Sequence, residues 1–188
     1  MIAIIGLGNP GEKYDNTRHN AGFLTIGRLA VKLGTELQES KKKPALMYAR
    51  TTDYELIVPL TYVNNSGEAV AKVQQKHNVE LNDIWVVHDD TEIPFGEFRV
   101  KRGGTSGGHN GIKSIDEAIG ADYWRIRIGV GRPENRNFDL ADYVLSNFTS
   151  EEQKTLPSII DQVTDYLVQS LKDKQIQAIT LNGTTKNN

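Results

Sequence analysis

The chain has 188 residues, of which 38% are hydrophobic and 24% charged, a composition that suits one globular domain with its own core. It contains no cysteine, which excludes disulfides, thiol catalysis and cysteine-ligated zinc. The net charge is −2, no apolar run approaches the ~20 residues of a membrane span, and no signal-peptide pattern opens the chain, so we expect a cytoplasmic protein with no membrane association.

The first predicted element is a strand over the apolar run from Ile2 to Leu7. A loop broken by glycines and Pro10 follows, and it carries Asn9, Tyr14 and His19 before a helix that begins near Asn20. In open α/β sheets, ligands bind just beyond the carboxyl ends of strands. The loop is therefore the first candidate part of a site.

The same loop contains Gly6, Gly8 and Gly11 in the spacing of the dinucleotide-binding fingerprint. That fingerprint requires a helix that starts within the glycines, so that its N-terminus meets the pyrophosphate. No helical periodicity follows directly here, and no second strand ends in an acidic residue at the expected distance. The pattern therefore does not favour a nicotinamide or flavin site.

The next elements are a helix with apolar spacing up to Leu33, ended by Gly34, and two strands over 45–51 and 54–60. Asn65 and Glu68 fit a capping box for a helix that runs to His77. An ordinary helix start explains Asn65, but it does not require the preceding Tyr62 and Asn64.

A short apolar strand over 84–87 is typical of a buried strand in a parallel sheet. It ends in His88, Asp89 and Asp90. Two carboxylates and a histidine at the carboxyl end of a central strand indicate a site rather than core packing.

The second half of the chain predicts a strand over 98–102, a glycine-rich loop over 103–108, and a helix that begins at His109 and Asn110 and ends at Gly120. A strand over 124–131 alternates arginine with isoleucine, helices follow over 140–148 and 151–171, and the tail 182–188 is predicted to be disordered. The whole chain, 1–188, is predicted to form a single α/β domain. Its sheet is twisted and mostly parallel, although mixed, with helices on its faces and a helical C-terminus.

The segment from Arg99 to Arg136 holds eight basic and four acidic residues, so its net charge is +4 while the rest of the chain carries −6. A local basic patch on an acidic protein and a set of solvated surface charges both fit this pattern.

If the strands are parallel, the loops after the first strand, after 54–60 and after 84–90 meet at one edge of the sheet. Histidine is the natural base near neutral pH, and a carboxylate on its other ring nitrogen fixes its tautomer. No serine lies in a nucleophile-elbow pattern, so water is the expected nucleophile, and an ester is a more suitable substrate than an amide. The amides of Asn9, Asn64 and Asn110 suit recognition of peptide groups.

Metal-dependent hydrolysis is the rival chemistry. Several side chains are of types that bind metal ions, but none of them shows the paired spacing of a metal motif: His19, His88, Asp89, Asp90 and His109.

At this point the sequence resembles the bacterial peptidyl-tRNA hydrolase family. The matching stretches occur in the family's order: GLGNPGEKYDNTRHNAG (6–22), PLTYVNNSGEAV (59–70), VVHDD (86–90), GGTSGGHNGIKSI (103–115) and RIRIGVGRP (125–133). Two positions depart from many members, which have methionine at Val63 and glutamate at Asp90.

The resemblance implies cleavage of the ester between a peptide and the terminal ribose of tRNA, without metal or other cofactor. No exposed apolar stripe is evident in the sequence, so we expect a monomer. The resemblance implies that His19 is the general base, that Asp89 orients it, and that Asn9 helps to distinguish peptidyl- from aminoacyl-tRNA. It also implies a set of residues that contact the peptide or tRNA: Tyr14, Tyr62, Asn64, His109 and Asn110, with Lys101 and Arg127 at the tRNA 5′ phosphate. Some similar proteins bind RNA without hydrolysis, which is the alternative function.

Overall fold

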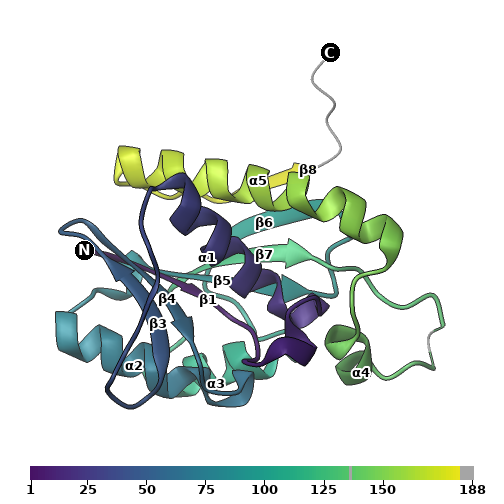
Figure 1. The fold of residues 1–188 in the computed structure, drawn as a ribbon, viewed down its shortest axis with the longest axis horizontal. Helices are drawn as coiled ribbons and strands as arrows, with labels where there is room; N and C mark the ends of the chain where they lie inside the picture. Colours follow the sequence, from purple (N-terminus) through teal and green to yellow (C-terminus); the bar gives the residue numbers. More distant parts are fainter. Residues whose placement is uncertain (136, 183–188) are drawn as a thin grey trace.

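In the computed structural model, which describes residues 1–135 and 137–182, a sheet of eight strands runs through the centre of the molecule (Figure 1). Its strands lie in the order β2-β3-β4-β1-β5-β7-β6-β8. Their bounds are β1 (Ile2–Gly6), β2 (Gln38–Glu39), β3 (Leu46–Arg50), β4 (Tyr54–Pro59), β5 (Ile84–Asp90), β6 (Glu97–Arg102), β7 (Trp124–Gly129) and β8 (Ile179–Asn182).

The centre of the sheet is parallel and its edges are antiparallel. Strand β1 pairs in parallel with β4 on one side and with β5 on the other, and β5 pairs in parallel with β7. Strands β2, β3, β6 and β8 add antiparallel pairs outside this centre. The predicted mixed α/β class is confirmed, and the carboxyl ends of β1, β4 and β5 meet at one edge as expected.

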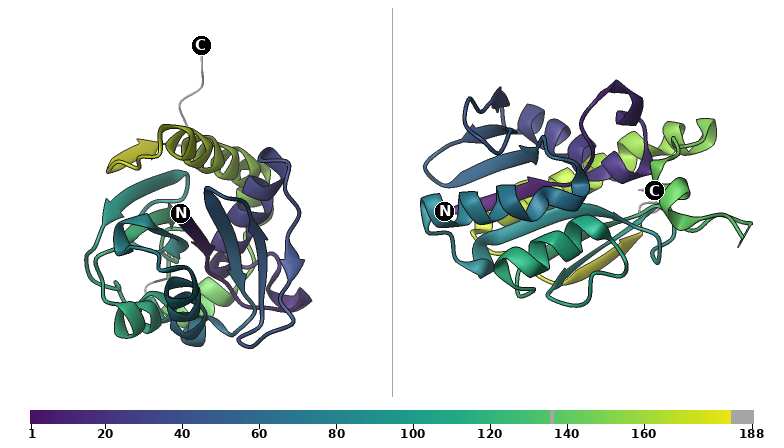
Figure 2. Two further views of the ribbon diagram at one scale, coloured as in Figure 1. Left: turned by 90° about the vertical axis from the view of Figure 1, so that its left-hand side faces the viewer. Right: turned by 90° about the horizontal axis from the view of Figure 1, so that it is seen from below.

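Helices cover both faces of the sheet (Figures 1 and 2). Helices α1 (Ala21–Lys32) and α5 (Ser150–Asp173) enclose one apolar core, with Ile4, Trp85 and Ile126 from the sheet. Helices α2 (Ser66–His77) and α3 (Asn110–Ile119) enclose the other, with Ile5 and Val86. The short helix α4 (Leu140–Leu145) lies apart from both layers, at the edge where the parallel strands end.

The first glycines of the chain serve packing rather than a nucleotide. A Cβ atom at Gly6 would lie 2.4 Å from the carbonyl oxygen of Gly22, so β1 and α1 approach each other closely. Two short 3₁₀ turns, η1 (Glu12–Tyr14) and η2 (Arg18–Asn20), separate the strand from α1. The helix therefore does not start within the glycines, as the dinucleotide fingerprint would require.

Several predicted details are wrong, each because of a tertiary contact. Asn65 precedes α2 but makes no side-chain cap, and the N–H of Gly67 donates instead to the hydroxyl of Ser114 on α3. The predicted helix over 140–148 stops at Leu145, because the next residues pair with 16–18.

At the C-terminus lies strand β8, which the sequence did not predict. It pairs with β6 and includes Asn182, the first residue of the predicted tail. The rest of that tail, 183–188, lies outside the described residues. The two-residue strand β2 was also missed.

Within residues 1–135 and 137–182, none of the helices combines the length and the apolar character that crossing a bilayer requires.

Candidate functional site

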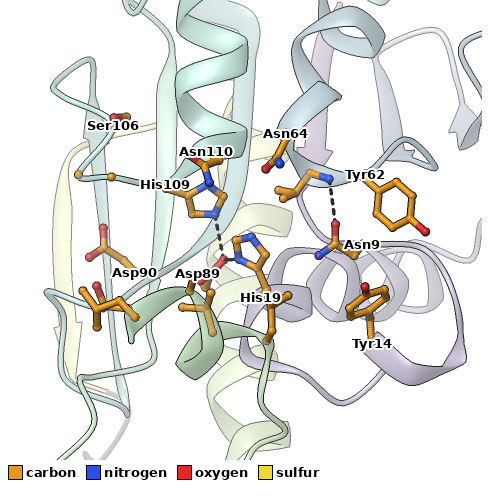
Figure 3. Close-up of a pocket in the computed structure, with 18 residues that line it drawn as sticks. Asn9, Tyr14, His19, Tyr62, Asn64, Asp89, Asp90, Ser106, His109 and Asn110 are labelled. Carbon is orange, nitrogen blue, oxygen red and sulfur yellow. Dashed lines mark hydrogen bonds and ion pairs between the residues drawn. The ribbon is translucent and has the colours of Figure 1, made fainter. Parts of the chain in front are cut away.

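A cavity of about 430 Å³ opens beyond the carboxyl ends of β1, β4 and β5 (Figure 3). Loops after these strands form one part of its wall, residues 106–110 at the start of α3 form another, and α4 forms the remaining side. The lining residues are Asn9, Tyr14, His19, Tyr62, Val63, Asn64, Asp89, Asp90, Thr91, Ser106, Gly107, Gly108, His109, Asn110, Leu140, Ala141, Val144 and Leu145. Eight of the ten predicted site residues are thus brought together.

A histidine and an aspartate meet in the wall of this cavity. Nδ1 of His19 lies 2.8 Å from Oδ1 of Asp89, and both side chains are buried. Burial opposes protonation of His19, but the charge of Asp89 and the hydrogen bond to it outweigh burial and raise the pKa of the imidazole above 6.5. Because Nδ1–H of His19 donates its hydrogen bond to Asp89, the Nε2 atom of His19 is left as the basic nitrogen.

His109 is a second partner of Asp89. Its Nε2 lies 2.9 Å from the same carboxylate oxygen, and its Nδ1 accepts hydrogen bonds from the backbone N–H groups of Gly111 and Ile112, as the N-cap of α3. An Nδ1 that accepts two bonds carries no proton, so the proton of this ring lies on Nε2 and is donated to Asp89. Burial opposes ionisation of Asp89, but the two rings keep the pKa of its carboxyl far below the usual range. Asp89 therefore remains a carboxylate.

His19, Asp89 and His109 form the one group of potential metal ligands found in the described residues, with their ligand atoms within 4.8 Å of one another. A metal ion on Nε2 of His109 would need the ring proton on Nδ1, where it would oppose the two backbone N–H groups of α3. The donor set is therefore arranged for protons rather than for a metal ion.

The other two candidate metal ligands, His88 and Asp90, form hydrogen bonds with other groups. Nδ1 of His88 contacts the backbone carbonyl of Asp89, and burial, followed by the nearby His109, lowers the pKa of His88 well below 6.5. Asp90 accepts hydrogen bonds from Nε of Arg127 and from the backbone of Glu92. Both side chains therefore support the site from its edge.

Asn9 is held in one orientation. Its side-chain oxygen accepts a hydrogen bond of 2.9 Å from the backbone N–H of Val63, while Asn20 bonds both its backbone N–H and its carbonyl. Since the oxygen is occupied, the NH₂ group of Asn9 is the part that faces the cavity (Figure 3).

The remaining predicted contacts lie at the mouth of the cavity. Tyr62, Asn64 and Asn110 line it and are exposed, and Tyr14 is half-buried beside them (Figure 3). Val63, by contrast, is buried and packs against Gly111, where a Cβ atom would approach within 2.7 Å of it.

Lys101 and Arg127 lie outside the cavity. The β6–β7 register sets Lys101 opposite Arg125 and Arg99 opposite Arg127, on the sheet face that carries α3. Arg125 is buried, with hydrogen bonds to Asp116 and to the carbonyl of Thr105, so it anchors the glycine-rich loop and is not a surface charge. Among the described residues, Lys101 has no ion-pair partner, which leaves its ammonium group available beside that loop.

Some residues of the site had no signal in the sequence. The apolar wall from α4 could not be predicted, because only the fold brings residues 140–145 to the cavity. Asn20 and Arg18 were visible only as polar residues before a helix. A polar residue that lies directly beside a candidate base is the one sign that could have singled them out.

Comparisons with known proteins agree with this geometry. A sequence model of the family described as peptidyl-tRNA hydrolase matches residues 3–188. The chain is 44% identical over 177 residues to a peptidyl-tRNA hydrolase of Rickettsia bellii, which covers 93% of this chain and 95% of that protein. It is 43% identical over 188 residues to one of Aliarcobacter butzleri, covering 99% of this chain and all of the relative.

The fold is also similar to a solved structure. The crystal structure of peptidyl-tRNA hydrolase from Acinetobacter baumannii superposes with a TM-score of 0.81 at 35% identity, over 92% of this chain and 87% of that one. With a family model that matches nearly the whole chain, and relatives that are similar along their full length, the protein belongs to the peptidyl-tRNA hydrolase family.

Proposed function

We propose that the protein hydrolyses the ester bond between a peptide and tRNA, releasing the peptide and free tRNA for reuse in the cytoplasm. The observation that carries the proposal is the His19–Asp89 pair, 2.8 Å apart, in a cavity lined by three asparagine amides. A base, an opening for water and neutral groups for peptide recognition are what this reaction needs. Binding RNA alone does not require a base that opens into such a cavity, so the pair favours hydrolysis over the alternative of RNA binding without catalysis.

His19 is the general base of the proposed reaction. Its Nε2 takes a proton from a water molecule, whose oxygen attacks the ester carbonyl and forms a tetrahedral oxyanion. The imidazolium that results is stabilised by Asp89, and it returns the proton to the ribose oxygen as the ester bond breaks. His109 keeps Asp89 in place through the second hydrogen bond to the same oxygen.

Asn9 supplies the donor for the oxyanion. Its NH₂ group is free because the Val63 N–H holds its oxygen, so it polarises the carbonyl rather than accepting a bond from water. The orientation of Asn9 supports giving it this role, which the sequence left open between Asn9 and Asn64.

Substituting Asn9→Asp is expected to lower kcat roughly 10²- to 10³-fold, as when an oxyanion donor is removed. The aspartate keeps an acceptor for the Val63 N–H, so this variant loses the donor but not that hydrogen bond. Asn9→Ala should lose both the donor and the buried acceptor, and should also unfold at lower temperature. A wild-type kcat in Asn9→Asp would show that Asn9 is not the oxyanion donor.

The charges of the cavity favour a blocked α-amino group. Its carboxylates are Asp89, which accepts bonds from two histidines, and Asp90, which accepts bonds from Arg127 and Glu92. A free α-ammonium group would lose water here without a free carboxylate partner, which is costly. Peptidyl-tRNA, whose nitrogen is an amide, avoids this cost.

The test compares N-acetyl-leucyl-tRNA with leucyl-tRNA, both in the presence of EDTA. We expect turnover of the acetylated substrate, with the same kcat with and without EDTA. Leucyl-tRNA should be hydrolysed more slowly by a factor of roughly ten or more, a difference in activation free energy of at least about 1.4 kcal/mol. No turnover of the acetylated substrate would overturn the proposed function. Activity that EDTA abolishes would instead indicate a metal centre.

We propose that Lys101 and Arg127 bind a tRNA phosphate beside the glycine-rich loop. Both lie on the sheet face that carries α3, and within residues 1–135 and 137–182 only Nε of Arg127 is hydrogen-bonded, to Asp90, so its terminal nitrogens are available. Contacts of this kind give salt-dependent binding with little sequence readout. The enzyme is proposed to act as a monomer.

Lys101→Ala is expected to raise KM more than it lowers kcat, and to reduce the slope of log KM against log salt by about 1. Lys172→Ala is the matched control, because Lys172 lies on α5, which covers the other face of the sheet, and this variant should leave the slope unchanged. Equal slopes in Lys101→Ala and wild type would contradict the phosphate contact.

A further inference from the structure

Helix α4 forms the apolar wall of the cavity, yet it has little support of its own. It is six residues long and contains no buried residue. Leu140, Ala141, Val144 and Leu145 face the cavity, and the hydroxyl of Tyr143 bonds the backbone carbonyl of Val130. A helix this short is not stable alone, so other contacts must determine the position of the wall.

Arg18 makes those contacts from the residue beside the proposed base. Its Nη1 atom lies 2.8 Å from the hydroxyl of Ser146 and 2.6 Å from the carbonyl of Asn147, directly after α4. Its Nη2 atom lies 2.5 Å from Glu152, and its guanidinium stacks on Tyr143 of α4, 4.3 Å from the ring centre. Arg18 is 4% exposed, so these contacts are shielded from water.

The backbone joins the same two segments. Thr17 and Asn147 form an antiparallel bridge, the N–H of Arg18 donates to the carbonyl of Ser146, and the N–H of Phe148 donates to the carbonyl of Asn16. Glu152 is also part of the capping box that starts α5 with Thr149. The turn that carries His19 is therefore tied both to the end of α4 and to the start of α5.

We infer that Arg18 is a positioning residue that holds α4 against the cavity and so sets the width of the peptide-binding site. The planar guanidinium contacts four groups in different directions, which the single ammonium of a lysine cannot reproduce. That the site binds a peptide rests on the proposed function. The contacts by which Arg18 holds α4 in place are a property of the free protein.

The test uses Arg18→Lys and Glu152→Gln, with Arg28→Lys as the matched control, since Arg28 pairs with Asp161 on the surface between α1 and α5. Glutamine at 152 keeps an acceptor for the Thr149 N–H but loses the charge opposite Arg18. We expect both test variants to raise KM for N-acetyl-leucyl-tRNA roughly tenfold, equivalent to about 1.4 kcal/mol of binding. Their kcat and the pH dependence of kcat should stay within about twofold, because the wall contacts ground state and transition state alike.

Hydrogen exchange of the free protein gives a readout that does not depend on turnover. Amides of residues 140–145 should exchange roughly tenfold faster in both variants, while those of β1 and β5 stay protected as in wild type. A lower melting temperature with unchanged KM and unchanged exchange in α4 would overturn the inference and leave Arg18 a purely structural residue. If Arg18→Lys does not fold, Glu152→Gln decides by the same two measurements. Failure of wild-type turnover would overturn the proposed function, whereas the exchange result would still test the hold on α4.

Discussion

Replacing His19 with alanine is expected to lower kcat for N-acetyl-aminoacyl-tRNA roughly 10²- to 10⁴-fold, the usual contribution of a positioned general base. KM should change little, because His19 acts on water and on the developing charge rather than on the bound peptide. Steady-state kinetics on purified protein measures both constants. Addition of free imidazole should restore part of the rate, since the variant leaves a space beside Asp89.

The matched control is His77→Gln. His77 is half-buried at the end of α2, contacts Arg50 and does not line the cavity. Its variant should turn over substrate at the wild-type rate. Near-wild-type kcat in His19→Ala, with the same melting temperature as the parent, would show that the base lies elsewhere.

Substituting Asp89→Asn should lower kcat roughly 10³- to 10⁴-fold, by analogy with the aspartate of a serine-protease triad. Asparagine places a neutral oxygen where His19 and His109 both meet a charged one, so the hydrogen bonds from both rings weaken. His19 is then free to place its proton on Nε2, which removes the base from the cavity. The geometry is otherwise preserved because aspartate and asparagine have nearly the same shape.

The pH dependence gives a second readout of the same pair. The base form of His19 predominates above its pKa, so the rate of the wild type should rise with pH and level off above 6.5, since Asp89 raises that pKa. In Asp89→Asn the charge that raises the pKa is lost and burial, which lowers it, remains. The acid limb of the residual activity should therefore move to lower pH.

Asp161→Asn serves as the control, because Asp161 pairs with Arg28 of α1 and does not line the cavity. Its acid limb and kcat should match the wild type. An acid limb that stays in place in Asp89→Asn would contradict the assignment of the titrating group to His19.

Local patterns predicted the elements that carry the site. The apolar run of β1 and the buried strand β5 were recognisable, because a strand buried on both faces must be apolar along its length. The loops after them were recognisable from glycine and proline, which end regular structure. The prediction that these loops meet at one edge followed from parallel pairing, and the register of β1 with β4 and β5 confirms it.

Side-chain partners were less predictable than elements. Asn65 looked like a cap, but Ser114 from α3 takes over the bonding at the start of α2, because the two helices pack closely at Gly67. The alternation over 124–131 placed Arg125 and Arg127 on one basic face, but it could not show that Arg125 is buried against Asp116 and that Arg127 is bound to Asp90. A hydrogen bond depends on which atoms meet in space, and periodicity carries no information on that.

The sequence by itself therefore determined the α/β class, the order of the loops and the kinds of side chain that they carry, because these depend on neighbours along the chain. The tertiary structure alone decided that His19 and His109 share one oxygen of Asp89, that Asn9 presents its NH₂ group, and that Arg18 reaches the end of α4. Each of these contacts joins segments separated by 20 to 129 residues along the chain. The contacts therefore depend on the packing of both cores, which brings those segments together.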